Sequence, residues 1–147
     1  MDAPETSKFG NPGQPFSQEA KDFLYAQVYN KMVKVKLLSK DQYSRAVGSV
    51  TSTSTEPRSK FLPFLTKKEE SDWSLKLIER GYATLYTGGG AQYNDRREEL
   101  IRKMEHAKKN KLGVWSIQHN NDGDGGEEYV DPAAYKRAMK ARMKTGR

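Results

Sequence analysis

Cysteine is absent from this chain of 147 residues. The absence excludes disulfide scaffolds, thiolate zinc sites, iron–sulfur clusters and cysteine nucleophiles. No apolar run approaches the roughly 18 residues that a membrane-spanning helix needs. Residues 1–20 also show no signal-peptide pattern, because they begin acidic and contain three prolines. We therefore expect the chain as written to be soluble.

Apolar residues are scarce as well. The hydrophobic fraction is 35% and the mean hydropathy is −0.94, which indicates that part of the length is unburied. Basic residues outnumber acidic ones by 26 to 19, giving a formal net charge of +7. This charge favours polyanionic partners, either nucleic acid or an anionic membrane face. The length fits one domain, alone or with a tail.

Periodicity predicts a helix followed by two strands. Ser17 is a suitable N-cap, an apolar stripe at helical spacing follows it, and Asn30 marks the expected end. Alternating lysines and aliphatic residues then predict a strand near 32–39. A turn over 39–42 leads to a partner strand over 45–51.

The next stretch changes character. Residues 52–70 are rich in serine and threonine at first, and we interpret them as a surface insertion between elements. Ser71 or Asp72 can cap a helix that ends at Gly81. Residues 82–86 are short and β-prone.

The longest predicted helix is capped by Asn94 or Asp95 and runs to about Asn110. His106 on this helix and His119 beyond it have no third partner at metal-ligand spacing. We therefore expect both histidines to be surface residues.

The end of the chain separates into a linker and a tail. Residues 117–131 form a polar, acidic linker, whereas 132–147 carry six basic side chains and no acidic one. Pro132 suits the first position of a helix, so a short basic helix is predicted there. The tail fits non-specific phosphate contacts and fits a solvated tail equally well.

Two short constellations can carry chemistry. In Asp2-Ala3-Pro4-Glu5-Thr6, an aspartate can ligate a hard cation such as Ca²⁺, and a nearby glutamate can hold or deprotonate a water. In Asp41-Gln42-Tyr43-Ser44-Arg45, a turn arginine can grip a phosphate with two parallel hydrogen bonds. Tyr43 can stack on a base or cover a sheet edge. Taken alone, each constellation is more typical of solvated surface residues.

Taken in order, these segments resemble the staphylococcal-nuclease-like (thermonuclease) family. Residues 2–6 resemble its D-x-P-E-x segment, residues 41–45 its D-x-Y-x-R turn, and residues 111–116 its closing K-x-G-x-W-S. The flanking residues 9–17 and 131–137 look closest to the fungal branch of probable mitochondrial endonucleases.

The resemblance implies an α+β fold, namely a five-stranded OB-type barrel with three packed helices. It implies Ca²⁺-dependent hydrolysis of phosphodiesters in DNA and RNA. By resemblance, Asp2 and the backbone carbonyl of Ala3 help to hold the metal, and Glu5 acts on a water as general base or positions it. Arg45 grips the phosphate and its transition-state charge, and Tyr43 matches the family's nucleotide-pocket tyrosine.

The sequence departs from the family pattern at its start, where Met1 directly precedes Asp2. The family has a β-meander there that supplies three strands, a second metal-binding aspartate and a second arginine. We therefore expect 1–116 to be a partial domain with impaired activity. The alternative is a non-catalytic module that binds nucleic acid.

The origin of this departure has three readings. An incomplete gene model or fragment is favoured, and a short isoform or a degraded remnant are the others. Mitochondrial or other membrane anchoring could come only from sequence upstream of Met1.

Overall fold

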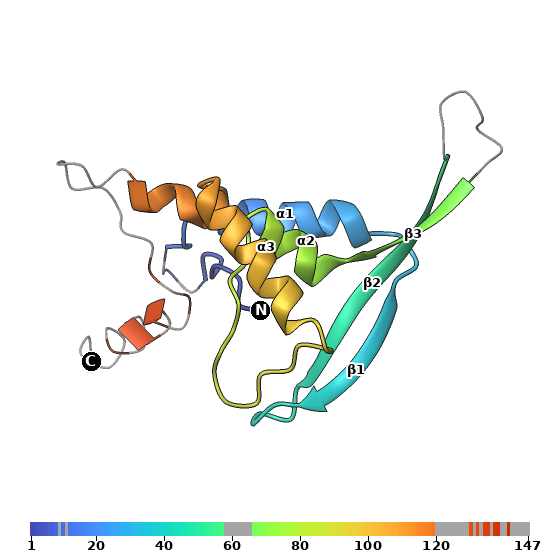
Figure 1. The fold of residues 1–147 in the computed structure, drawn as a ribbon. Coiled ribbons are helices and arrows are strands. Elements are labelled where there is room, and N and C mark those ends of the chain that lie inside the picture. The colour runs from blue at the N-terminus through green and yellow to red at the C-terminus, as the bar shows by residue number, and fades with distance from the viewer. Residues whose placement is uncertain are drawn as a thin grey trace.

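The described part of the chain includes helices α1, α2 and α3 and one antiparallel sheet, so the predicted α+β class is confirmed (Figure 1). This computed structural model describes residues 1–8, 10, 12–57, 66–119, 130, 132, 134–135, 137–138 and 141. The elements in chain order are α1 (Ser17–Val28), β1 (Lys34–Lys40), β2 (Ala46–Pro57), β3 (Thr66–Asp72), α2 (Trp73–Glu79), α3 (Arg97–Lys109) and the 3₁₀ helix η1 (Gly113–His119).

The sheet has the order β1-β2-β3, with both neighbouring pairs antiparallel. The β1–β2 register shifts between Leu37 and Ser39, which marks an irregularity of the bulge type. Both predicted strands exist, although Ser39 and Lys40 belong to β1 and not to the turn.

The expected surface insertion over 52–70 is wrong for the residues that the structure describes. Residues 52–57 continue β2 and residues 66–70 belong to β3, paired from Thr51↔Asp72 to Pro57↔Thr66. The two arms extend away from the helices (Figure 1). Each arm is a strand because it pairs with the other arm, which a local reading of its polar residues does not reveal. Residues 58–65 lie outside the described part.

Helix α1 begins one residue earlier than a Ser17 cap requires. Phe16 occupies the cap position with a left-handed φ of 63°, and no side chain caps the helix. Ser17 is the first helical residue and is buried. The helix ends at Val28, and Asn30 follows with a positive φ of 54°, in agreement with the expected stop.

The cap predicted for the longest helix is also wrong. Asn94 and Asp95 have positive φ values of 51° and 59° and precede the helix, which begins at Arg97 without a side-chain cap. Asn94 instead accepts a hydrogen bond from Lys36 of β1 at 2.6 Å. A contact to a distant strand therefore replaces the local cap.

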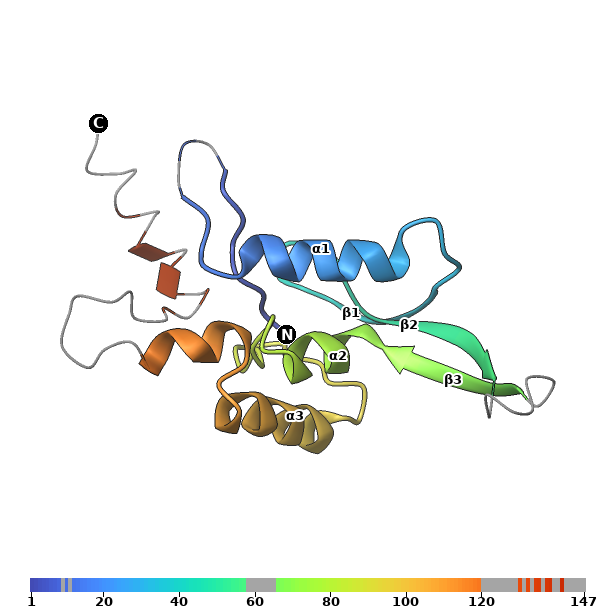
Figure 2. The same cartoon turned by 90° about the horizontal axis from the view of Figure 1, so that it is seen from above.

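Helix α2 lies at the centre of the core. It is flanked by α1 on one side and α3 on the other (Figure 2). Its buried residues join others in one cluster, which consists of Leu75, Leu77, Ile78, Ala83 and Leu100. In the predicted β-prone segment 82–86, Thr84 forms an isolated bridge with Asp2. The bridge holds the start of the chain against the residues that follow α2.

The end of the chain is described at a few positions. Helix η1 extends to His119 and so crosses the expected boundary between domain and linker. The described residues of the tail, namely Pro132, Ala134, Tyr135, Arg137, Ala138 and Ala141, are helical. No helix in the described ranges has the length and apolar character needed to cross a bilayer.

Candidate functional site

The turn between β1 and β2 is closed by the side chain of Asp41. Its Oδ1 accepts hydrogen bonds from the backbone N–H groups of Tyr43 at 2.8 Å and Arg45 at 2.9 Å. An aspartate that bonds the backbone ahead of it stabilises a tight turn. Ser44 takes a positive φ of 61° within this turn. The D-x-Y-x-R spacing therefore corresponds to a turn in which the aspartate bonds the backbone of the tyrosine and of the arginine.

Arg45 and Tyr43 come together on this turn. The Arg45 Nε lies 2.6 Å from Asp41 Oδ2, and its guanidinium carbon lies 5.2 Å from the centre of the Tyr43 ring. The Arg45 side chain is 73% exposed and Tyr43 is 69% exposed. A cation and an aromatic ring are thus both presented to solvent beside one another.

Asp41 partly neutralises this arginine. Desolvation raises the pKa of Asp41, but hydrogen bonds from Arg45 and Tyr43 outweigh it and leave the pKa below its ordinary value. The carboxylate is therefore ionised at neutral pH. A phosphate that binds Arg45 must compete with it.

The segment that carries Asp2 and Glu5 is held at two points. Asp2 and Thr84 exchange backbone hydrogen bonds of 2.9 and 2.8 Å. Glu5 N–H donates to Gln14 Oε1 at 2.9 Å, and Glu5 C=O accepts from Gln14 N–H at 2.8 Å. Ala3 packs against the core cluster. The backbone around Glu5 is consequently fixed by Gln14.

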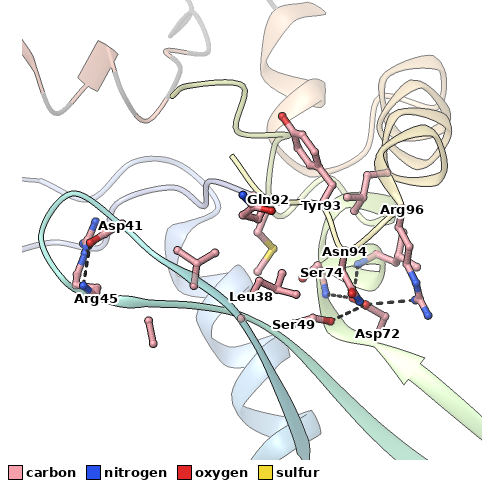
Figure 3. Close-up of a pocket in the computed structure, with 16 residues that line it drawn as sticks. Leu38, Asp41, Arg45, Ser49, Asp72, Ser74, Gln92, Tyr93, Asn94 and Arg96 are labelled. Carbon is pink, nitrogen blue, oxygen red and sulfur yellow. Dashed lines mark hydrogen bonds and ion pairs between the residues drawn. The ribbon is translucent and has the colours of Figure 1, made fainter. Parts of the chain in front are cut away.

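A cavity of about 430 Å³ lies between the β1–β2 hairpin, the start of α2 and the loop before α3. Arg45 and Asp41 lie at one end of it, and Asp72 and Arg96 lie at the other, with Leu38 between them (Figure 3). Met1 also lines it. Glu5 is not among the described lining residues, so the structure does not place Glu5 and Arg45 on one cavity.

Asp72 forms a polar cluster that the sequence did not reveal. The predicted cap is confirmed, because its Oδ1 accepts from Ser74 N–H at 2.8 Å and from Leu75 N–H at 3.2 Å. Its Oδ2 also accepts from the Ser49 hydroxyl at 3.2 Å and from Arg96 at 3.3 Å. Only 6% of its side chain is exposed. This carboxylate joins β2, α2 and the loop before α3, and its role is structural.

A second hollow of about 380 Å³ lies between β1 and the loop before α3. Lys36, Tyr93 and Arg97 line it, and Arg97 lies 5.9 Å from the centre of the Tyr93 ring. Sequence reasoning did not single out Tyr93, because Lys36 comes to this hollow from a distant strand. Cations beside an aromatic ring suit the backbone and bases of single-stranded nucleic acid.

Metal-binding groups are not clustered in the described ranges. No three or more histidine, aspartate or glutamate side chains there lie close enough to hold an ion. His106 is exposed, as expected. The side chain of His119 lies outside the described part of the structure.

Comparison with known proteins adds what the geometry does not supply. A family model described as "Staphylococcal nuclease homologue" matches residues 1–117. The chain is 37% identical over 136 residues to "Endonuclease Htp3" of Saprolegnia parasitica, covering 92% of this chain and 54% of that protein. It is 37% identical over 118 residues to "Probable endonuclease lcl3" of Schizosaccharomyces japonicus, covering 80% and 47%. It is 34% identical over 142 residues to "Probable endonuclease LCL3" of Komagataella phaffii, covering 95% and 53%. The chain spans about half the length of these curated relatives.

Proposed function

The chain belongs to the staphylococcal nuclease family, as its three motifs predict, and we propose that it hydrolyses phosphodiester bonds in DNA or RNA. The observation that carries the proposal is the family match over residues 1–117, which include all three motifs. Relatives named endonucleases support it.

Glu5 and Arg45 are the proposed catalytic residues. The oxygen of a water molecule attacks phosphorus, and Glu5 either accepts a proton from this water or holds the water in position. The bond between phosphorus and the leaving nucleotide oxygen then breaks. Arg45 grips the phosphate and stabilises the charge that grows in the transition state. The exposure of Arg45 beside the Tyr43 ring supports this role. Tyr43 is the proposed substrate contact.

The family resemblance implies Ca²⁺, with Asp2 and the Ala3 carbonyl as ligands. Calcium takes six to eight oxygen ligands, and the described residues bring no three acidic or histidine side chains together. Within the described residues, the acidic and histidine side chains therefore do not complete a calcium site. We propose for this reason that the 147-residue chain by itself cleaves slowly.

The proposed domain organisation keeps residues 1–116 as part of an OB-type barrel domain. The β2–β3 arms within 52–70 extend from it, and 117–131 and 132–147 are the acidic linker and the basic tail. The family match over residues 1–117 supports the first of these boundaries.

Nucleic-acid binding without cleavage is the second candidate function. The hollow lined by Lys36, Tyr93 and Arg97 favours it, together with the net charge of +7. Such binding is expected to weaken steeply as salt rises, because phosphate contacts release counterions.

One assay separates the two functions. Labelled single-stranded DNA is incubated with the purified chain in Ca²⁺ or in chelator, and products and retained complex are both measured. Slow Ca²⁺-dependent product that disappears in Glu5→Gln and Arg45→Ala supports the nuclease. The matched controls Glu19→Gln and Arg102→Ala, both at exposed helix positions, should cleave like the parent.

The other outcomes are equally informative. Salt-sensitive retention without product supports the binding module. Robust cleavage that both variants lose overturns the proposed impairment. Cleavage that persists in Glu5→Gln and Arg45→Ala overturns the assigned residues, and neither product nor retention overturns both functions.

A further inference from the structure

The C-terminal segment packs on the loop that carries Glu5. Gln14 Nε2 donates to the backbone carbonyl of Val130 at 2.8 Å, and the Tyr135 hydroxyl donates to the carbonyl of Pro12. Pro132 is fully buried. Both views place the described tail residues beside the loop before α1 (Figures 1 and 2). Val130, Pro132 and Tyr135 lie beyond residue 117, where the family match ends.

Gln14 connects this segment to Glu5. The Gln14 residue is 6% exposed, and its carboxamide is used at both ends. Its Oε1 accepts from Glu5 N–H and its Nε2 donates to Val130 C=O, at 2.9 and 2.8 Å. The buried Gln14 side chain thus links residue 5 to residue 130.

The two ends of the carboxamide depend on each other. A buried amide group is costly to leave without a partner. Because Val130 offers an acceptor, the Nε2 end must face it, and the Oε1 end then faces Glu5 N–H. Without Val130, the Gln14 amide would lose the partner that fixes its orientation. The bond from Glu5 N–H to the Gln14 carboxamide therefore depends on the tail, whereas the bond from Gln14 N–H to Glu5 C=O joins backbone groups only.

We propose that Val130, Pro132 and Tyr135 form a strap that positions Glu5 through Gln14. Gln14 is a positioning residue, because it touches the backbone of Glu5 and acts through it. The functional meaning of the strap rests on the proposed role of Glu5. Its structural part does not, since the contacts exist whatever Glu5 does.

Amide hydrogen exchange of the full chain tests the strap directly. Tyr135→Phe removes the hydroxyl that bonds Pro12, and Pro132→Asp places a charge at a buried position. Both should speed exchange of the Glu5 amide, by roughly tenfold for the loss of one net hydrogen bond. Amides of Leu77 and Ile78 in the core helix α2 report global unfolding. Tyr25→Phe, at an exposed tyrosine that stacks on Tyr29, is the matched control.

Faster exchange at Glu5 with unchanged α2 amides supports the strap. Unchanged exchange at Glu5 in Tyr135→Phe and Pro132→Asp overturns it. If the exchange rate of the Glu5 amide rises only as much as the rates of the α2 amides, the result also counts against the strap, because equal increases report unfolding of the whole domain.

Cleavage kinetics provide the second readout. Where the chain cleaves, Gln14→Ala should lower kcat severalfold and leave KM within about twofold, because the strap positions Glu5 and does not bind substrate. An equal rise in KM would argue against positioning. A chain without any cleavage contradicts the proposed nuclease function, and the exchange result still decides whether the strap exists.

Discussion

The backbones of Gly81 and Gly113 approach each other closely between the end of α2 and the start of η1. Val114 N–H donates to Gly81 C=O at 2.9 Å. A Cβ on Gly113 would come 2.3 Å from Gly81 O, and one on Gly81 would come 2.0 Å from Leu112 O. Both glycines also have positive φ, 69° and 53°. The glycine of the K-x-G-x-W-S motif therefore serves this close backbone approach.

Gly113→Ala is expected to destabilise the domain strongly. The left-handed backbone alone costs about 1–3 kcal/mol for a residue with a side chain, and the clash with Gly81 adds to it. Urea unfolding followed by circular dichroism measures the change. Gly89→Ala is the matched control, because nothing lies within 4 Å of its added Cβ, and it should stay within about 0.5 kcal/mol of the parent. Equal stability of the two variants would contradict the steric explanation.

Asp72→Ala should cost more than the loss of a helix cap. An N-cap contributes about 0.5–2 kcal/mol, and the variant also leaves the Ser49 hydroxyl and Arg96 without this acceptor, so about 2–4 kcal/mol is expected. Asp72→Asn keeps a capping oxygen and should lose less. Asp22→Ala removes an exposed aspartate bonded to Gln18 and serves as the control. A loss of 1 kcal/mol or less in Asp72→Ala, about that of a cap alone, would show that the contacts to Ser49 and Arg96 add nothing.

The ion pair between Glu79 and Lys103 joins α2 to α3 and makes stability depend on pH. The hydrogen bond from Lys103, at 2.6 Å, holds the pKa of Glu79 below its usual 4.5. A carboxyl whose pKa is lowered by folding stabilises the fold above its unfolded pKa, and this is lost as the pH falls through the folded pKa.

Glu79→Gln should therefore lower stability at pH 7, by up to about 1 kcal/mol for a partly exposed pair. The difference from the parent should shrink as the pH falls below about 4. Thermal or urea unfolding across this pH range measures it. Glu105→Gln removes the carboxylate of the more exposed Glu105–Lys108 pair and should have little effect. A difference that stays constant from pH 7 to pH 3 would refute the linkage.

Asp41→Asn is expected to tighten binding of single-stranded DNA. The asparagine keeps the Oδ1 acceptor that closes the turn but removes the charge that competes with phosphate for Arg45. A gain of roughly severalfold at low salt should shrink as salt screens the charges. Fluorescence anisotropy at two salt concentrations measures it. Asp22→Asn makes the same change in net charge on α1, and an equal gain there would show that total charge alone matters.

The local pattern determined those features that depend on near neighbours in the chain. The Asp41 turn, the Asp72 cap and the end of α1 were all predicted, because their partners lie within a few residues. The motifs also predicted the family. They identified Tyr43 and Arg45 as candidate site residues, and the structure places these two side by side on one turn. The catalytic and metal-binding roles of Glu5, Arg45, Asp2 and Ala3 stay predictions.

Tertiary structure decided whatever joins distant segments. The β2–β3 arms pair residues whose polar sequence predicts a surface insertion. Asn94 accepts a hydrogen bond from Lys36 and does not cap a helix. Likewise the sequence around Gln14 predicts only a polar loop residue, and the bond from its side chain to Val130 appears only in the folded chain. A side chain's local preferences are fixed by its own backbone neighbourhood, whereas its partners across the fold depend on packing that no short window of sequence contains.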